Sequence, residues 1–336
     1  MTTIVFFNNK GGVGKTTLVY HFSYMLSELG YMVLAVDLDP QSNLTSMFLT
    51  QERLEEIFSM QENRPTILKA INPILTGTGD IAKGEIEKIT DCLGLICGDL
   101  ELSVFEDELS ENWGKCMDRK EAAFRVISSF YRIIKESASS QNADFVIVDV
   151  GPNLGALNRA IMIAADYVII PMTADLFSLQ GLKNLGSTLK EWRIQWKTRW
   201  GGNLNRELII PEGTMEPIGY IVMQHGIRET RPVKSYLKWA NKIPGAYRQY
   251  VLEADKKEEI SVESDPYQLA MLKHYHSLAP LAMEAHKPMF LLKPADGIIG
   301  GHVEAVRNVY EDFKNLTEAV FKKLPDSIIQ NKNLII

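Results

Sequence analysis

The chain has 336 residues, of which 46% are hydrophobic, and a formal net charge of −6. This apolar content can bury a substantial core and excludes disorder over most of the chain. The acidic balance excludes a histone-like basic protein, so any contact with nucleic acid needs a local basic patch. The three cysteines are too few for a disulfide framework and fit a reducing compartment. No apolar stretch reaches the roughly 18 residues that a membrane-spanning helix needs.

The first 37 residues predict a strand, a glycine-rich turn, a helix and a second strand. Thr3–Phe7 is a short β-branched and aromatic run, and the apolar residues between Leu18 and Leu29 fall on one helical face. Met32–Val36 is a second apolar run. Continuously apolar strands joined by a helix are typical of a parallel sheet with helices on both faces.

From about residue 50 to residue 120 the pattern loosens into acidic helical stretches and glycine-containing turns, with one strand predicted at Leu93–Cys97. Regular alternation then returns. The predicted elements are a helix near Glu121–Glu136, a strand at Phe145–Asp149, a helix near Leu154–Ala165, a strand at Tyr167–Ile170 closed by Pro171, a helix over Leu179–Trp200, a strand at Ile218–Met223, a helix after Pro232 and a helix over Val303–Leu324. We therefore predict one α/β domain over residues 1–336, with a mostly parallel twisted sheet, an insertion at about 50–120 and a helical C-terminal elaboration at about 230–325.

The turn after the first strand carries the most specific chemical motif. It reads Lys10-Gly11-Gly12-Val13-Gly14-Lys15-Thr16-Thr17. Backbone N–H groups in such a turn, backed by the positive end of a helix, form a site for phosphate. In a phosphate loop Lys15 would contact the β- and γ-phosphates and the Thr16 hydroxyl would ligate Mg²⁺. Asn9 departs from the usual pattern, which has glycine at that place.

Acidic residues at the ends of two predicted strands complete this candidate site. Asp37 and Asp39 follow the second strand, at the edge where ligands collect in open α/β sheets. Asp149 ends a run of four apolar residues, the form of a Walker B strand that brings a carboxylate to Mg²⁺. The alternative for the first two aspartates is helix capping. No Asn-Lys-X-Asp sequence for guanine is present, which favours ATP, with the backbone near Pro171 as a neighbour of the adenine.

Lys10 makes the phosphate loop resemble that of the ParA/MinD family of partition and positioning ATPases, whose Walker A motif is a deviant one. In that family the extra lysine reaches the partner's phosphates across a nucleotide-sandwich dimer. The resemblance implies a P-loop NTPase fold, a catalytic role for Lys10 and a homodimer in the ATP-bound form. The alternative for Lys10 is a solvated side chain that only tunes the local charge.

The same resemblance assigns roles to the aspartates. It implies that Asp39 orients or activates the attacking water, that Asp37 supports the metal side and that Asp149 belongs to the Mg²⁺ site. It also implies slow ATP hydrolysis, stimulated by a centromere-binding or cargo adaptor protein. The match is specific over residues 1–50 and 144–182, although Gly151 stands where the family often has proline, and it is weak over 216–324.

Two windows in the second half are basic within this acidic chain. Each of residues 183–206 and 228–248 holds six cations against one acid. The windows predict a face that binds DNA phosphates without reading sequence, with candidates Arg193, Lys197, Arg199, Arg228, Arg231 and Lys234. Some ParA-type proteins bind DNA in this way. The alternative is an ordinary solvated face. The tryptophans at 192, 196 and 200 would form one stripe, for core packing or for stacking and docking.

Rival classes are partly separated by sequence. A MinD-like membrane switch needs a basic amphipathic C-terminal helix, whereas residues 325–336 contain one lysine, so no stable membrane insertion is expected. An iron–sulfur scaffold lacks the paired cysteines that it would need, and a small-molecule kinase or ligase does not account for Lys10. We expect a cytoplasmic, nucleoid-associated prokaryotic protein. An ATP-switch regulator that acts on a protein complex or membrane, without carrying DNA, is the alternative.

Overall fold

The computed structural model describes residues 1–60, 63–225, 227–228, 231–232, 234–254, 260–275 and 277–329. Within 224–235 it describes the backbone only, and elsewhere in these ranges it also describes the side chains. In this part of the chain the main sheet has eight strands in the order β10-β7-β6-β1-β5-β2-β4-β3. The strands are β1 (Thr2–Phe6), β2 (Val33–Asp37), β3 (Glu87–Lys88), β4 (Leu93–Ile96), β5 (Phe145–Asp149), β6 (Tyr167–Thr173), β7 (Glu216–His225) and β10 (Gln268–Lys273). Neighbouring strands are parallel except for β3 and β4. The predicted mostly parallel α/β sheet is confirmed.

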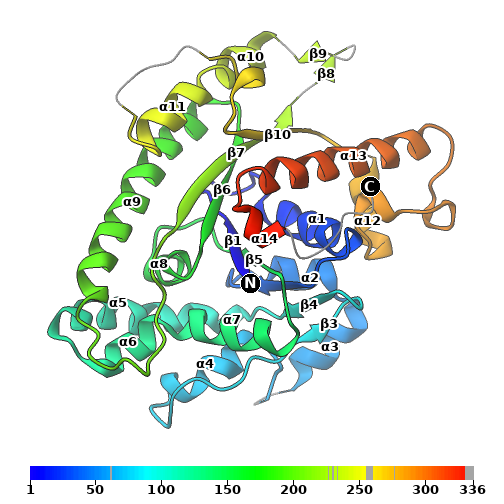
Figure 1. Ribbon diagram of the computed structural model, residues 1–336. Coiled ribbons are helices and arrows are strands. Elements are labelled where there is room, and N and C mark those ends of the chain that lie inside the picture. Colours follow the sequence, from blue (N-terminus) through cyan, green and yellow to red (C-terminus); the bar gives the residue numbers. More distant parts are fainter. Residues whose placement is uncertain are drawn as a thin grey trace.

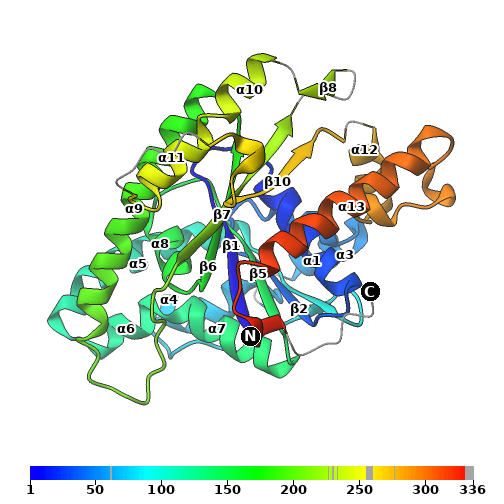
Figure 2. The same ribbon diagram turned by 45° about the horizontal axis from the view of Figure 1, so that its top comes forward.

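Helices cover both faces of the sheet, and each face has its own hydrophobic core (Figures 1 and 2). One face is covered by α4 (Ile67–Leu75), α5 (Phe105–Lys115), α6 (Glu121–Ile127), α7 (Ser129–Ser140), α8 (Ala156–Ile163), α9 (Leu176–Trp200), α10 (Lys234–Ala240) and α11 (Ile243–Tyr250). The other is covered by α1 (Lys15–Glu28), α2 (Asn43–Phe48), α3 (Gln51–Ser59), α12 (Leu278–Ala285), α13 (Gly301–Phe321) and α14 (Asp326–Ile329). Along β1, Val5 faces the first core and Ile4 and Phe6 face the second, because successive strand residues point to opposite faces.

The prediction that Pro171 closes a strand is wrong, because β6 continues to Thr173. Proline lacks the N–H that a central strand normally uses. The carbonyl of Ile169 accepts from the Phe7 N–H, so Ile169 and Pro171 both turn their polar groups toward β1. β1 has already ended at Phe6, and the missing N–H of Pro171 therefore costs no bond of the sheet.

The helix predicted near 121–136 is two helices, α6 and α7, that meet at Ser128. Ser128 leaves the helical backbone (φ −90°, ψ 4°), and its hydroxyl donates to the Phe124 carbonyl at 2.6 Å. A serine hydroxyl that bonds the preceding turn competes with the helix for backbone partners. The periodic apolar pattern continues across this break, and for that reason the sequence did not reveal it.

Residues 50–120, predicted as an insertion, contribute β3 and β4 to the sheet. Ile67 of α4 and Phe105 and Leu109 of α5 lie fully buried in the first core. A short helical segment, η1 (Leu100–Val104), leads from β4 into α5. This stretch is therefore packed into the domain.

The C-terminal elaboration adds a strand as well as helices. β10 pairs with β7 at the sheet edge, and α13 covers the second core. β10 was not predicted, because only two of its residues, Leu269 and Leu272, are buried and the strand has no regular alternation. A separate pair of short strands, β8 (Ile227–Arg228) and β9 (Arg231–Pro232), lies before α10. No helix in the described ranges is long and apolar enough to cross a membrane.

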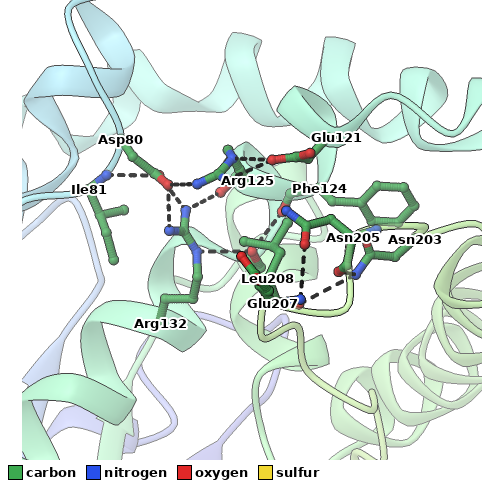
Figure 3. Close-up of polar contacts among 11 residues, drawn as sticks. Asp80, Ile81, Glu121, Phe124, Arg125, Arg132, Asn203, Asn205, Glu207 and Leu208 are labelled. Atoms are coloured by element: carbon green, nitrogen blue, oxygen red, sulfur yellow. Dashed lines mark hydrogen bonds and ion pairs between the residues drawn. The ribbon is translucent and has the colours of Figure 1, made fainter.

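A network of ion pairs fixes the segment between α4 and β3 against α6 and α7 (Figure 3). Arg132 of α7 donates to both oxygens of Asp80, at 2.6 and 2.8 Å, and Arg125 of α6 also pairs with this carboxylate. The backbone N–H of Ile81 donates to Asp80 at 2.8 Å, and Arg125 pairs with Glu121. Burial alone would raise the pKa of Asp80, but these hydrogen bonds lower it overall. Every charge of this network has a protein partner.

Candidate functional site

The glycine-rich loop between β1 and α1 has the backbone of an anion-binding turn. Gly12 and Gly14 have φ of 71° and 86°, in the left-handed region that favours glycine. A side chain at Gly14 would also come within 2.9 Å of Met223 Cε in β7. The other loop members are Gly11, which is exposed, Val13, which is buried, and Thr16 and Thr17, which are partly exposed. The loop presents N–H groups at the positive end of α1, where an anion binds favourably.

Lys15 is the first residue of α1 and is only 7% exposed. Its ammonium donates to the backbone carbonyl of Lys10 at 3.4 Å. Burial lowers the pKa of Lys15, and the carboxylates of Asp149 and Asp39 act in the opposite direction. A partly desolvated ammonium at the base of the loop is suited to a phosphate, which would stabilise its charge.

Asp149 is a buried carboxylate whose oxygens have no hydrogen-bond partner among the described residues. It ends β5 directly opposite Asp37 of β2. Burial, and next the negative charge of Asp37, raise the pKa of Asp149 well above its usual range, while the neighbouring Thr16 hydroxyl and Lys15 lower it by less. A buried carboxylate without a partner is costly, so this position favours the binding of a cation.

Asp149 and Thr16 fit a Mg²⁺ ion that takes most of its ligands from phosphate and water and only one or two from the protein. Within the described ranges, no group of three His, Cys, Asp or Glu side chains could hold a metal by itself. Mg²⁺ commonly takes one or two protein oxygens and keeps phosphate and water as its other ligands. The partnerless oxygens of Asp149 and the hydroxyl of Thr16 are oxygen donors of this kind.

Asp37, also predicted for the metal site, has protein partners for both oxygens. One oxygen accepts from the N–H and the hydroxyl of Thr45, at 2.8 and 2.7 Å, and the other accepts from the Asp39 N–H at 3.3 Å. Thr45 lies in the first turn of α2, so Asp37 performs the helix capping that the sequence allowed. Burial raises the pKa of Asp37 to about 6, although the Thr45 bonds oppose this shift. Its support of a metal would therefore be indirect.

Asp39 lies beside the segment that follows β5. It is 7% exposed, and one of its oxygens accepts from the Gln41 N–H at 3.1 Å. A Cβ added at Gly151 would lie 3.2 Å from the same oxygen. Gly151, the departure from the family pattern, therefore leaves room for Asp39 at this point.

Lys10 is bound within its own chain. Its ammonium donates to Asp175 at 2.6 Å, to the Thr173 hydroxyl at 3.0 Å and to the Ser178 hydroxyl at 3.3 Å. Asp175 also caps α9 by accepting from the Ser178 N–H. Burial would raise the pKa of Asp175, but the hydrogen bonds from Lys10, Thr173 and Ser178 hold it at about 2. The ion pair is about one-third exposed on each side, so solvent reaches it.

The two asparagines before Lys10 join the loop to β6 and α9. Asn8 donates to the carbonyl of Pro171 at 2.6 Å and accepts from the Lys10 N–H at 2.9 Å. Asn9, which replaces the usual glycine, packs against α9 at Gly181, where an added Cβ would lie 3.2 Å from the Asn9 oxygen. Pro171, predicted as an adenine neighbour, is thus buried behind the loop and fixed by Asn8.

Among the DNA-binding candidates, two arginines make contacts inside the molecule. Arg193 donates to the carbonyls of Thr214 and Met215, and Arg199 donates to the Trp113 carbonyl and stacks over the Trp113 ring at 4.5 Å. Lys197 is exposed. The side chains of the remaining candidates, Arg228, Arg231 and Lys234, lie outside the described residues.

The tryptophan stripe of α9 divides between core and surface. Trp192 and Trp196 are buried, and Trp196 stacks on Trp113 with ring centroids 5.7 Å apart. Trp200 at the end of the helix is 47% exposed. Core packing therefore accounts for the first two members of the stripe.

The sequence did not single out several residues that shape the site. Asp175 could have been found, because aspartate three residues before Ser178 at a helix start is a capping signal. Thr45, Asn8 and Met223 act through contacts between separate segments, for which the sequence carries no local signal.

Curated proteins of several prokaryotes are similar in sequence to this chain. The chain is 35% identical over 195 residues to an uncharacterized protein of Methanocaldococcus jannaschii, covering 57% of this chain and 66% of that protein. It is 29% identical to the sporulation initiation inhibitor protein Soj of Bacillus subtilis, covering 69% and 78%. It is 28% identical to the chromosome partitioning protein ParA of Caulobacter vibrioides, covering 60% and 64%. The chain thus spans less than two thirds of some of these relatives.

Solved structures share the fold over nearly the whole chain. A Corynebacterium diphtheriae protein has a TM-score of 0.72 at 23% identity, covering 97% of this chain and 100% of that one. Cyanothece McdA in complex with ATP has a TM-score of 0.61 at 18% identity, covering 96% of each chain. A putative plasmid partition protein of Borrelia burgdorferi bound to AMPPNP has 0.57 at 20%, covering 96% and 99%.

A family model described as an AAA domain matches residues 1–200, more than half of the chain. This region contains the phosphate loop, the three aspartates and the strands that carry them. The curated relatives include the sporulation initiation inhibitor protein Soj and the chromosome partitioning protein ParA. The chain belongs to this family of ParA-like partition ATPases.

Proposed function

We propose that this chain binds ATP with Mg²⁺ at the loop between β1 and α1 and hydrolyses it. The observation that carries the proposal is the buried carboxylate of Asp149, which has no close hydrogen bond among the described residues and lies near the Thr16 hydroxyl and the Lys15 ammonium. McdA and the Borrelia protein share the fold and hold ATP or AMPPNP, which supports the same ligand here. The sequence has no guanine-selecting Asn-Lys-X-Asp motif, and this favours adenine.

Each residue of the site would have a distinct role. The N–H groups of residues 11–17 and the ammonium of Lys15 would bind the phosphates. Thr16 and Asp149 would hold Mg²⁺, which neutralises charge on the phosphate oxygens when bound. Asp39 would orient the attacking water, at the position where it adjoins Gly151.

The proposal includes an ATP-bound homodimer that is completed by Lys10. In the dimer Lys10 would leave Asp175 and contact the phosphates held by the other protomer. The solvent-accessible ion pair supports this exchange, because pairs of this kind contribute only about 0–1 kcal/mol. Hydrolysis would be slow and stimulated by a centromere-binding or cargo adaptor protein.

We further propose that the dimer binds non-specific DNA through basic residues of both sequence windows. α9 and α11 pack closely: a Cβ at Gly186 of α9 would lie 2.0 Å from the Tyr250 carbonyl. The two helices line a groove of about 770 Å³, in which Lys183 comes from one window and Lys242 from the other. Exposed lysines from two segments on one surface support phosphate contacts that are independent of sequence.

The ATP site is tested with Lys15→Ala, and the exposed lysine change Lys120→Ala is the control. We expect Lys15→Ala to lower ATP affinity or turnover at least about 100-fold, because it removes the buried cation of the loop. Isothermal titration with ATP·Mg²⁺ and phosphate release measure the two quantities. Unchanged binding and turnover in this variant would refute the assignment of the phosphate loop.

DNA binding is tested by retention of a long non-specific duplex with ATP·Mg²⁺, with ADP and without nucleotide, at two salt concentrations. We expect tight binding only with ATP, weaker at high salt because bound phosphates release counterions. A Lys183→Glu/Lys242→Glu variant should lose DNA but keep ATP binding, and Lys120→Glu is its control. No DNA binding by the wild type would leave the ATP switch and shift the search to a protein or membrane target.

A further inference from the structure

The start of α8 is capped by a side chain from another helix. The residue before α8 is Gly155, which has no side chain to satisfy the first N–H groups. Glu106 of α5 takes this role: its two carboxylate oxygens accept from the N–H groups of Ala156, at 2.5 Å, and Leu157, at 2.7 Å. An anionic acceptor at the positive end of a helix makes strong hydrogen bonds.

The close contact also explains Gly155. A Cβ added there would lie 2.4 Å from the Glu106 oxygen, which is closer than any real contact. The backbone of Gly155 is extended, with φ of −79° and ψ of −177°, so its conformation does not require glycine. Glycine is needed here for space, because the carboxylate of Glu106 occupies the place of a side chain.

Residues 151–155, the segment between β5 and α8, depend on where α8 begins. The Asn158 amide in α8 donates to the carbonyls of Gly151, at 2.8 Å, and Asn153, at 2.7 Å. Gly151 in turn adjoins the Asp39 carboxylate, and Asp149 lies two residues before it. A shift of the first turn of α8 therefore changes the position of the segment that borders both carboxylates.

α5 is itself fixed, so Glu106 is a firm support. At the other end of this helix, the Trp113 ring lies between aromatic and cationic neighbours from two helices: Arg159 of α8 at 4.1 Å, Arg199 of α9 at 4.5 Å and Trp196 of α9 at 5.7 Å. Trp113 also donates from its indole nitrogen to Gln195 at 3.0 Å. The helix is thus attached both at the start of α8 and to α9.

We infer that Glu106 is a positioning residue for ATP hydrolysis, which acts through α8 on the segment 151–155 next to Asp39 and Asp149. The inference rests on the proposed ATPase activity. Glu106 would touch neither nucleotide nor water, and it would set the geometry of the chemical step without contributing to ATP binding. Small misplacements of groups around a reacting centre can cost up to about 100-fold in rate.

The test is Glu106→Gln, with Asp107→Asn as the matched control, since Asp107 is the exposed acid next to it on the same helix. Each N–H donates to a different carboxylate oxygen, so a glutamine amide in the same position replaces one acceptor by an NH2 group that opposes the N–H facing it. We expect kcat to fall about tenfold while KM for ATP and the affinity for AMPPNP stay within about twofold. Asp107→Asn should match the wild type. Rates are measured at protein concentrations where turnover per protomer is constant.

A second variant, Gly155→Ala, reaches the same contact from the other side, because its methyl group would displace the carboxylate. We expect the same loss of kcat at constant KM, and this variant decides the test if Glu106→Gln does not fold. Wild-type kcat in a folded variant, or equal losses of kcat and ATP affinity, would overturn the inference. A wild-type protein that does not hydrolyse ATP would instead overturn the proposed function, and the inference with it.

Discussion

The carboxylates of Asp149 and Asp80 differ in their hydrogen-bond partners and in the direction of their pKa shifts. Asp80 accepts hydrogen bonds from Arg132, Arg125 and a backbone N–H, and the balance of burial and these bonds lowers its pKa (Figure 3). Asp149 is fully buried and has no close hydrogen bond to either oxygen among the described residues, and burial raises its pKa although the nearby Thr16 hydroxyl opposes the shift. Protein groups satisfy the carboxylate of Asp80, whereas that of Asp149 has no close protein hydrogen bond among the described residues.

Hydrogen-bond partners separate structural acids from acids that are expected to bind a ligand. A carboxylate with protein partners contributes to stability, because removing it leaves partly buried arginines without that partner. A buried carboxylate without partners costs stability and is retained where a ligand will compensate for it.

The largest effect is expected on activity. Asp149→Asn should lower Mg²⁺-dependent ATP turnover at least about 100-fold, because the amide is a poor ligand for a hard cation. Asp80→Asn removes the same charge away from the phosphate loop and should keep turnover within about twofold. Phosphate release at saturating ATP, with a Mg²⁺ titration, measures both variants. Equal losses in the two variants would contradict the distinction.

Stability should change in the opposite sense. Without nucleotide, Asp149→Asn should raise the free energy of unfolding by about 1 kcal/mol at pH 7.5, because it removes an uncompensated buried charge. Asp80→Asn should lower it by about 1 kcal/mol, because Arg132 loses its carboxylate partner and Arg125 keeps only Glu121, in surroundings that solvent partly reaches. Urea unfolding followed by circular dichroism gives both values. A loss of stability in Asp149→Asn would show that this carboxylate is satisfied in the free protein.

The sequence predicted that Lys15 and Asp149 lie close together, and it did not reveal the pairing of Asp80. Lys15 and Asp149 follow short apolar strands whose carboxyl ends meet at one edge of a parallel sheet, so local patterns place them together. Asp80 and Arg132 are 52 residues apart, and no periodicity marks their pairing. Glu106 reaches α8 over a similar separation. Contacts of this kind depend on how helices pack, which the pattern of a single helix does not specify.

The third prediction concerns His21, a buried group that is complete only when neutral. One ring nitrogen bonds the Thr17 carbonyl at 2.8 Å, and the other accepts from the Met289 N–H at 3.1 Å. Burial lowers the pKa of His21 to about 4. Below about pH 6.5 the unfolded chain therefore binds a proton at His21 that the folded protein does not bind. The folded protein loses stability for this reason as the pH falls from 6.5 toward 4.

His21→Gln isolates this contribution from that of the carboxylates. We expect the variant to be less stable than the wild type at pH 7.5, since glutamine fits the two bonds less well. The difference in the free energy of unfolding between the wild type and the variant should be about 2 kcal/mol smaller at pH 5, because only the wild type must release a histidine proton when it folds there. Urea unfolding at the two pH values measures the difference, and a constant deficit would show that His21 titrates normally.

The smallest effect is expected at the ion pair of Lys10 and Asp175, which lies between the two extremes. The pair is complete in the free protein, yet it is about one-third exposed, and the proposed dimer requires Lys10 to leave it. Asp175→Asn keeps a residue that can cap α9 and removes the charge that holds Lys10. Because an exposed pair contributes about 0.5–1 kcal/mol and the dimer breaks one pair in each protomer, ATP-dependent dimerisation should become about five- to thirtyfold tighter. Sedimentation equilibrium with ATP·Mg²⁺ measures this, and Asp107→Asn controls for the loss of one charge. Weaker dimerisation would instead mean that Asp175 guides Lys10 toward the partner, which would make the carboxylate part of the assembled site.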